Sequence, residues 1–240
     1  MARVASALAA IMALATLASA TAEARSATVT SGPFTFTLPP GWRDVSPGVP
    51  AAKLADIPAA LVERARRSRS AMIAFDLAGA NDGFVENVNA RIARCPAELT
   101  EASVKGISAN LAKRLRGQAG GARVVPLKAG VTTIGGVRCG RVVQDLDLGT
   151  VRARQLVYYM PAGKQCAVVT YSAGREAFAR YRPIFEASAN ATRGLRAPEQ
   201  RGFWSRILHS AGRGALIGGI AGGLAVLLAG LFVWVRRRKR

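Results

Sequence analysis

Short segments that alternate between hydrophobic and polar residues occur along much of the chain, and this is the pattern of strands that bury one face. The alternation is strict in Phe34–Leu38, where Pro39-Pro40-Gly41 ends it. Gly135-Gly136 predicts a two-residue hairpin between two longer runs. We expect strands at 34–38, 71–78, 85–93, 122–134 (one strand or two short ones), 137–147, 151–160 and 165–173, with turns at Asn81-Asp82-Gly83, Leu148-Gly149 and Pro161-Ala162-Gly163.

Other segments repeat their apolar residues with helical spacing. A helix is expected at 51–67, where Pro58 can start a second helix, and another at 100–115, where Thr100 and Glu101 suit its first turn. A last helix is expected at 176–193, kinked or restarted at Pro183 and capped by Gly194. Strands, a helix, a run of antiparallel strands and a final helix predict an α+β domain, an antiparallel β-sheet with helices packed on it.

The first 24 residues have the parts of a secretory signal peptide. Arg3 supplies the positive charge, Val4–Leu17 is a short apolar core, and three overlapping A-x-A sites follow between Ala18 and Ala24. The core is shorter than the about 20 residues that a bilayer span needs. The alternative is an uncleaved anchor or a buried helix.

The other end of the chain predicts a transmembrane helix, because 215–235 contains no charged residue and is long enough to cross a bilayer. The basic tail that follows belongs on the cytoplasmic side, and the signal peptide independently places the domain outside. A buried core helix is a poor alternative, since this segment is apolar all round. The predicted tail residues are Arg236, Arg237, Arg238, Lys239 and Arg240.

The predicted organisation is therefore a signal peptide at 1–24, an exported domain at 25–200, an amphipathic juxtamembrane linker at 201–214, a span at 215–235 and a cytoplasmic tail at 236–240. Trp204, Ile207 and Leu208 are expected at the membrane interface. Glycines spaced by multiples of four favour close packing of two spans, as a homodimer or with a partner span, although glycine is also common in membrane helices. They are Gly214, Gly218, Gly222 and Gly230.

Four stretches resemble PsbP-like domains, a family that includes photosystem extrinsic proteins, a yeast Ran-binding relative and bacterial envelope proteins. They are 34–46, which begins FTFTLPPGW, the segment ENVNARI at 86–92, the hairpin TIGGVR at 133–138 and the closing helix with Phe178, Tyr181 and Phe185. The resemblance covers 34–195. It implies an α/β/α sandwich around an antiparallel sheet, and it carries over no catalytic residue or cofactor.

The charge is strongly basic: 27 Lys and Arg against 13 Asp and Glu lie between Arg25 and Gly212. In a cytosolic protein this excess would indicate nucleic acid, which an exported domain rarely meets. Anionic membrane lipid or envelope polymers are the available partners, unless the charge is only a bias of composition.

Candidate chemistry is sparse. The only histidine, His209, lies after the domain, which excludes a catalytic or zinc-binding histidine within it. Cys139 and Cys166 are expected two strands apart, beyond disulfide reach, so Cys95 would pair with Cys139 or Cys166. Buried free thiols are the alternative that we prefer.

Asp145 and Asp147 lie two apart on one strand and therefore share a face. Paired carboxylates can bind metal or transfer protons. However, a hairpin places Arg152 nearly opposite Asp145, and a cross-strand ion pair is the plainer interpretation. No catalytic or metal site and no cofactor is predicted.

The preferred hypothesis is a membrane-anchored extracytoplasmic binding or assembly module without catalytic activity, located at the bacterial inner membrane with an envelope protein as partner. The alternative is a ligand sensor or an unfamiliar enzyme acting on an anionic or sugar substrate. A sorting signal at the C-terminus is disfavoured, because the Gly-Gly pairs lie within the apolar stretch rather than ahead of it.

Replacing Gly218 and Gly222 together with Leu should abolish a detergent-resistant dimer of the full-length protein, because the bulkier side chains keep two helices apart. Gel electrophoresis in mild detergent measures the dimer. A dimer that survives the double substitution would show that this face does not cause it.

Overall fold

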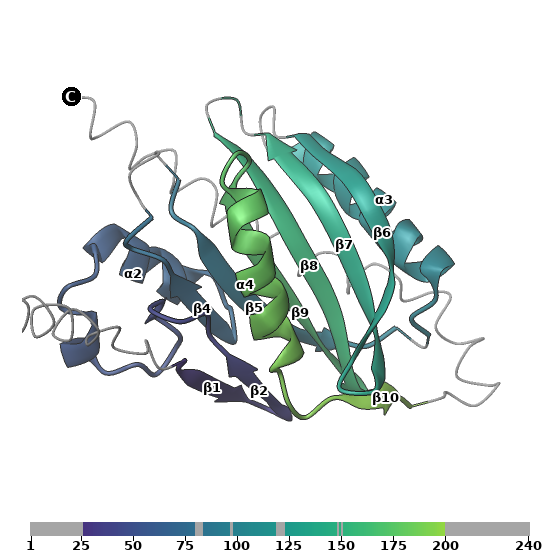
Figure 1. The fold of residues 1–240 in the computed structure, drawn as a ribbon, viewed down its shortest axis with the longest axis horizontal. Helices are drawn as coiled ribbons and strands as arrows, with labels where there is room; N and C mark the ends of the chain where they lie inside the picture. The colour runs from purple at the N-terminus through teal and green to yellow at the C-terminus, as the bar shows by residue number, and fades with distance from the viewer. Residues whose placement is uncertain are drawn as a thin grey trace, which may run out of the picture.

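One large, mostly antiparallel sheet organises the molecule (Figure 1). The computed structural model describes residues 26–79, 84–96, 98–118, 123–147, 149 and 151–199. Across the sheet the strands are β3 (Arg43–Asp44), β4 (Met72–Phe75), β5 (Asn87–Arg94), β9 (Gln165–Gly174), β8 (Arg152–Gly163), β7 (Val137–Asp147) and β6 (Arg123–Ile134). The short β10 (Arg196–Pro198) adds in parallel to the end of β8, and β1 (Thr28–Ser31) with β2 (Phe34–Thr37) forms a separate two-stranded sheet.

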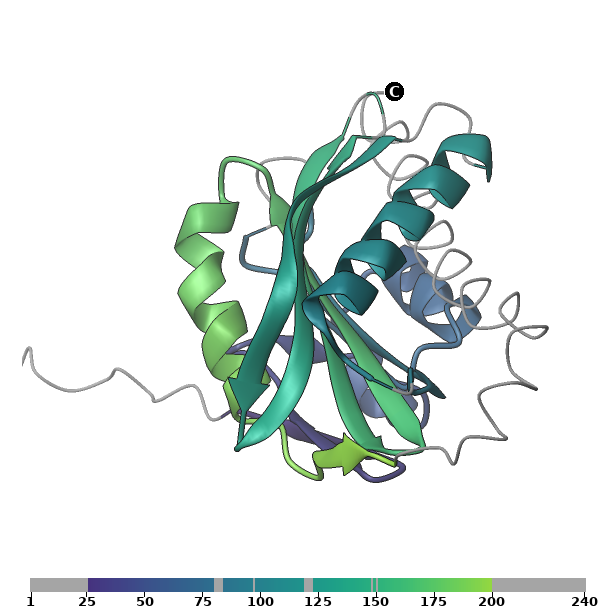
Figure 2. The ribbon, with the colours of Figure 1, turned by 90° about the vertical axis from the view of Figure 1, so that its right-hand side faces the viewer.

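Helices lie on both faces of this sheet (Figure 2). The helix α4 (Phe178–Asn190) covers one face. The helices α2 (Ala59–Arg67) and α3 (Glu101–Gln118) lie on the opposite side, and the 3-10 turn η1 (Ala51–Leu54) precedes α2. The predicted α+β class is thus confirmed, with the expected break at Pro58, which stands immediately before α2.

The core under α4 is aromatic. Phe185 is fully buried and stacks on Tyr171 of β9, with ring centroids 5.1 Å apart. Trp42 meets Phe185 edge-on at 5.8 Å. Phe34 and Phe36 of β2 belong to the same cluster, so the small sheet closes this core beside α4. Offset and edge-to-face rings are the arrangements that aromatic side chains prefer.

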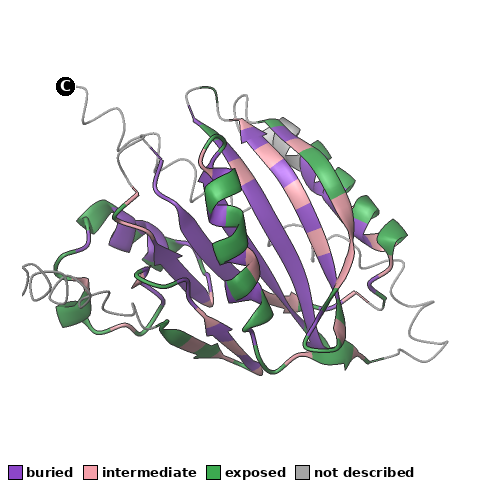
Figure 3. Ribbon diagram, viewed as in Figure 1, coloured by how far each residue is buried: buried purple, intermediate pink, exposed green. Residues whose placement is uncertain are grey.

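The opposite face carries two apolar clusters instead of one. Leu111 and Val104 of α3 pack on residues of β6, β7, β8 and β9, including Val142 and Val157. Residues of α2, such as Leu61, pack with β4 in a separate cluster. The central strands are buried along most of their length, as Figure 3 shows.

A row of buried polar side chains crosses the sheet on this face. Gln144, Gln155, Ser172 and Asn87 stand opposite one another on β7, β8, β9 and β5. Gln144 Nε2 donates to Gln155 Oε1 (2.8 Å), and Gln155 Nε2 donates to Ser172 Oγ (3.1 Å). All four residues are buried. Gln144, Gln155 and Ser172 are thus linked by hydrogen bonds, whereas Asn87 Nδ2 donates to Val85 O and Gln144 Oε1 has no partner among the described residues. Buried polar groups of this kind are stable in a core while they stay paired.

Most of the expected elements begin or end one to three residues from the bounds predicted, and three differences have a structural reason. The strand β8 runs through Pro161 to Gly163. Proline is tolerated there because it has no N–H to donate, and β7, which pairs with β8 only as far as Tyr159, requires no hydrogen bond from that position. The helix α4 continues through Pro183, where a kink or restart was expected. Gly194 lies beyond the end of α4 rather than capping it: it has φ +83°, and a Cβ would stand 1.7 Å from the Pro33 carbonyl oxygen.

The signal peptide, the juxtamembrane linker, the predicted span, the tail and the Asn81-Asp82-Gly83 turn all lie outside the described residues. Within the part of the chain that is described, no helix combines the length and hydropathy needed to cross a membrane.

Gln155→Leu should lower the free energy of unfolding by about 2–4 kcal/mol, because it leaves the Gln144 amide and the Ser172 hydroxyl without a buried partner. Urea denaturation of the full-length protein measures the loss. The double variant with both Gln144→Leu and Gln155→Leu should lose less stability than the two single variants lose together, since the two glutamines share one hydrogen bond. Strict additivity would mean that the row does not act as a network.

Candidate functional site

The strand β6 forms one edge of the sheet (Figure 1). It is 12 residues long and pairs with β7 on one side. On its other side no strand of the described chain pairs with it. The edge at the far end of the sheet is different, because β3 has only 2 residues. An edge strand presents a row of unpaired N–H and C=O groups to which another chain can add.

The two halves of β6 differ in how that edge is protected. In the first half Pro126 lacks an N–H, and a register shift between Pro126 and Lys128 bends the ladder. Both are devices by which proteins discourage strand addition. The second half, Ala129–Ile134, pairs without interruption and contains no proline, charge or bulge. Only this second half, which we call the open edge, is a regular template for another strand.

The hairpin geometry decides which groups of the open edge point outward. Gly135 and Gly136 have φ of +54° and +77°, as a two-residue turn of type I′ requires. Such a turn closes on a hydrogen-bonded pair, Ile134 and Val137, and hydrogen-bonded and non-bonded pairs then alternate along an antiparallel ladder. Thr133, Val131 and Ala129 are therefore the residues whose N–H and C=O groups point away from β7.

The surroundings of the open edge are basic and carry one exposed apolar side chain. Arg123, Lys128 and Arg138 are exposed, and none of them has an ion-pair partner among the described residues. Leu127, at the bulge, is 49% exposed and is the most exposed large hydrophobic residue described. The edge thus offers backbone hydrogen bonds, positive charge and an apolar contact side by side.

The predicted carboxylate pair is engaged in ion pairs. Asp145 accepts from Arg154 Nε at 2.6 Å and lies 3.3 Å from Arg175 Nη2. Asp147 lies 3.6 Å from Arg152 Nε. The hydrogen bond from Arg154 to Asp145 raises the pKa of Arg154. Each carboxylate therefore has an arginine as its counter-ion, as the ion-pair interpretation of this face expected.

The partner of Asp145 differs from the one expected. Arg154 stands opposite Asp145, and Arg152 stands opposite Asp147. The register is shifted by two residues because β7 ends at Asp147 and β8 begins only at Arg152, so the connection is longer than the Leu148-Gly149 turn. Asp147 Oδ1 accepts from Gly149 N (2.9 Å) within this connection. A cross-strand ion pair was expected here and is found. Its predicted members, Asp145 and Arg152, were wrong because the prediction assumed a two-residue turn.

Two of the three cysteines form a disulfide. Cys95 is joined to Cys166, with Cα atoms 4.5 Å apart, in place of the free thiols that we preferred. Cys139 stays free and fully buried on β7, separated from Cys166 by β8. Burial raises the pKa of the Cys139 thiol to about 11, so it remains protonated and unreactive at neutral pH.

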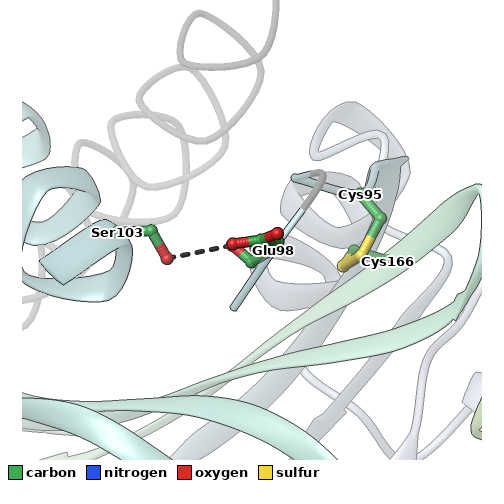
Figure 4. Close-up of a disulfide and its surroundings, with 4 residues drawn as sticks. All are labelled: Cys95, Glu98, Ser103 and Cys166. Carbon is green, nitrogen blue, oxygen red and sulfur yellow. Dashed lines mark hydrogen bonds between the residues drawn. A yellow bond between two sulfur atoms is a disulfide. The ribbon is translucent and has the colours of Figure 1, made fainter. Parts of the chain in front are cut away.

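The disulfide holds the segment that leads into α3 (Figure 4). Cys95 N donates to Lys164 O (2.9 Å), which extends the β5–β9 contact beyond the last paired residues. Farther along, Thr100 caps α3: Ser103 N donates to Thr100 Oγ1, while Thr100 N donates to Ser103 Oγ. Ser103 Oγ also donates to Glu98 O (3.0 Å). The start predicted near Thr100 is found there, as a reciprocal capping arrangement.

Several predicted site residues lie outside the described residues. They are the helix-packing glycines 214, 218, 222 and 230, the interface residues 204, 207 and 208, and the tail 236–240. Among the described residues no three His, Cys, Asp or Glu side chains are placed to share a metal ion. Sequence reasoning missed the open edge, because the pattern within one strand does not show where that strand lies in the sheet. The buried polar residues did leave a signal in the sequence, namely alternate polar residues at Asn87 and Asn89 of β5, a strand whose first half is buried on both faces.

Comparison with solved structures identifies the architecture. The solution structure of cyanobacterial PsbP (CyanoP) from Synechocystis sp. PCC 6803 superposes with a TM-score of 0.51 at 13% identity, covering 74% of this chain and 96% of CyanoP. The fold is PsbP-like. The Ran-binding protein Mog1p of Saccharomyces cerevisiae also matches, with a TM-score of 0.43 at 12% identity, covering 70% of this chain and 95% of Mog1p. No protein-family model matches the sequence, and no characterised protein matches it by sequence.

Replacing Cys95 and Cys166 together with Ala should lower the free energy of unfolding of the PsbP-like domain by about 2–4 kcal/mol, because the bridge closes a loop of 71 residues in the unfolded chain. Chemical denaturation measures the effect. Cys139→Ala is the matched control, because it removes a cysteine that is not in the bridge. The intact mass of this variant should still be two hydrogens below the mass of the same variant after full reduction, which shows that its disulfide is kept. Equal stability with and without the bridge would contradict the expected role.

Proposed function

We propose that the chain is a membrane-anchored binding or assembly module, without catalytic activity, whose PsbP-like domain acts outside the cytoplasm at the bacterial inner membrane. The observation that carries the proposal is the open edge of β6, a regular strand edge that no described strand covers. Main-chain hydrogen bonds along such an edge give affinity, and neighbouring side chains give specificity.

The candidates for chemistry that the sequence offered support a binding role. Asp145 and Asp147 are neutralised by arginines, Cys139 is buried and protonated, and the other two cysteines form a disulfide. An enzyme needs an activated nucleophile or a base of suitable pKa within reach of its substrate. The alternative of an enzyme that uses Asp145 and Asp147 is weakened by these contacts.

The location proposed rests on the sequence and is supported by the cysteines. A signal peptide at 1–24 and a span at 215–235, followed by a basic tail, place the domain outside. The Cys95–Cys166 disulfide suits that placement, since disulfides persist in oxidising compartments. In this arrangement the linker at 201–214 and the span at 215–235 contact membrane lipid. A homodimer formed through the spaced glycines of the span is a separate prediction.

The charge around the open edge defines the chemistry of the partner. The cations of Arg123, Lys128 and Arg138 favour an extended segment that carries acidic residues. The edge of a second copy would bring the same cations together, which disfavours edge-to-edge pairing of this chain with itself. We therefore propose that the occupant is an acidic, extended segment of another envelope protein.

The test uses the full-length chain in its membrane with a photo-crosslinking amino acid at Leu127. We expect one recurrent envelope protein, crosslinked within an acidic segment. Thr133→Pro should reduce the capture at least tenfold, because it removes an outward N–H while leaving the hydrogen bonds to β7 in place. Thr133→Ala is the matched control and should capture normally, because it keeps that N–H.

A crosslinker at Ile184, which is 37% exposed on α4, controls for position and should not capture the same protein. Equal capture by Thr133→Pro and Thr133→Ala would exclude strand addition at β6. Adducts with only lipid or the chain itself would contradict an envelope partner and favour a ligand sensor.

A further inference from the structure

Basic residues surround the turn between β8 and β9. Arg94 of β5 stands opposite Gln165, the first residue of β9. Arg196 of β10 stands opposite Ala162 of β8. Ala162 and Gln165 are themselves paired across the turn, and Lys164 lies between them in the chain. The backbones of Arg94 and Arg196 are therefore separated by three neighbouring-strand spacings, or about 14 Å.

A fourth basic residue is brought to the same end by the small sheet. Arg193 N donates to Thr35 O (2.9 Å) and Thr35 N donates to Arg193 O (3.2 Å), so Arg193 is held against β2. The turn between β1 and β2 lies next to β9, because a Cβ on Gly32 would stand 3.6 Å from Gln165 Oε1. We call this group of four residues, at the end of the sheet that carries β10 in Figure 1, the basic end: Arg94, Lys164, Arg193 and Arg196.

The charges of the basic end are accessible to solvent. All four residues are exposed. Among the ion pairs of the described residues, only one involves this group, between Lys164 and Glu199 at 3.5 Å, and the Lys164 side chain is 81% exposed. Glu98, three residues beyond Cys95, is a second acid near this end. Four exposed cations therefore stand against two acids.

The opposite end of the same two strands has a balanced charge. Arg175 N donates to Arg152 O (3.1 Å), so these two arginines lie side by side at the far end of β8 and β9. Arg152 pairs with Asp147, and Arg175 pairs with Asp145. Unpaired positive charge on this pair of strands is thus concentrated at the end where β8 turns into β9.

The chain also leaves the described domain at the basic end. Glu199 N donates to Gly163 O (3.3 Å), next to Lys164. Trp204, which is expected at the membrane interface, follows Glu199 by five residues, and an extended chain covers at most about 18 Å over that length. The proposed anchor therefore keeps the basic end close to the lipid surface.

We propose that the basic end binds the anionic phospholipid headgroups of the membrane in which the chain is anchored. Each Lys or Arg close to an anionic bilayer strengthens binding about fivefold, and the attraction acts over about 8 Å at physiological salt. Exposed guanidinium groups can also donate paired N–H groups to phosphate oxygens. The contact fixes how the domain stands on the membrane, and the inference rests on the proposed membrane anchor.

The test uses the full-length chain in vesicles of phosphatidylcholine alone, or of equal parts of phosphatidylcholine and phosphatidylglycerol. A photo-crosslinking amino acid replaces Ala197, which is exposed on β10 beside Arg196. Mass spectrometry measures the lipid adducts. They should be about tenfold more frequent in the mixed vesicles, and they should decrease as salt is raised, because salt screens exposed charges.

Removing charge from the basic end should remove the adducts. Arg193→Gln combined with Arg196→Gln should reduce them about tenfold in the mixed vesicles, whereas lysine at both positions should keep most of them. Arg152→Gln combined with Arg175→Gln is the matched control, because it removes the same charge from exposed residues at the opposite end, and it should leave the adducts unchanged.

A crosslinker at Ala179, which is exposed in the first turn of α4, controls for position and should form few lipid adducts in either kind of vesicle. Equal adduct frequencies at Ala197 in the two kinds of vesicle would overturn the inference. So would an equal decrease in the two double variants. In native membranes the crosslinker at Ala197 should again capture lipid, and a recurrent protein captured in its place would assign the basic end to a protein partner instead.

Flotation separates a failure of this inference from a failure of the proposed function. Protein that is released from pure phosphatidylcholine vesicles at high salt has no membrane anchor, and this result would contradict both. Protein that stays with those vesicles, but shows no preference for phosphatidylglycerol at Ala197, would contradict the inference alone. Crosslinking from Leu127 tests the open edge separately.

Discussion

The antiparallel pairing of β8 with β9 is the contact on which the rest of the structure depends. Their ladder runs from Ala153 opposite Gly174 to Ala162 opposite Gln165, and both strands lie in the middle of the sheet. Alternate residues of each strand point to opposite faces. Leu156 and Tyr171 therefore lie under α4, while Val157 and Val168 lie under α3, and each face requires its own helical cover.

The same ladder distributes the polar groups of the molecule. It aligns Gln155 with Ser172 inside the sheet, where they join the buried polar row. On the other side of β9, the β5–β9 ladder brings Cys166 to the end of β5, next to Cys95. Helices cover both faces of the sheet (Figure 2), and within the described part of the chain the backbone along β6 has no strand on its outer side.

Local sequence signals predicted the elements well where the signal and the contact are close together. The strand 137–147 has the predicted bounds, since Gly135-Gly136 makes both the turn and the register. The prediction failed where a longer connection was read as a tight turn: Asp145 lies opposite Arg154 instead of Arg152. The helix also does not restart at Pro183, because the packing of Tyr181 and Phe185 in the aromatic core keeps α4 continuous across it.

The sequence by itself determined the α+β class, the hairpin at Gly135-Gly136, the start of α3 at Thr100 and, as predictions, the signal peptide and the span, because each depends on neighbouring residues and the period of the chain. Only the tertiary structure decided that Cys95 pairs with Cys166 and that β6 is, among the described strands, an open edge of the sheet. These features depend on which segments, distant along the chain, come to lie side by side. Periodicity tells which face of a strand is buried, but not which strand or helix covers it.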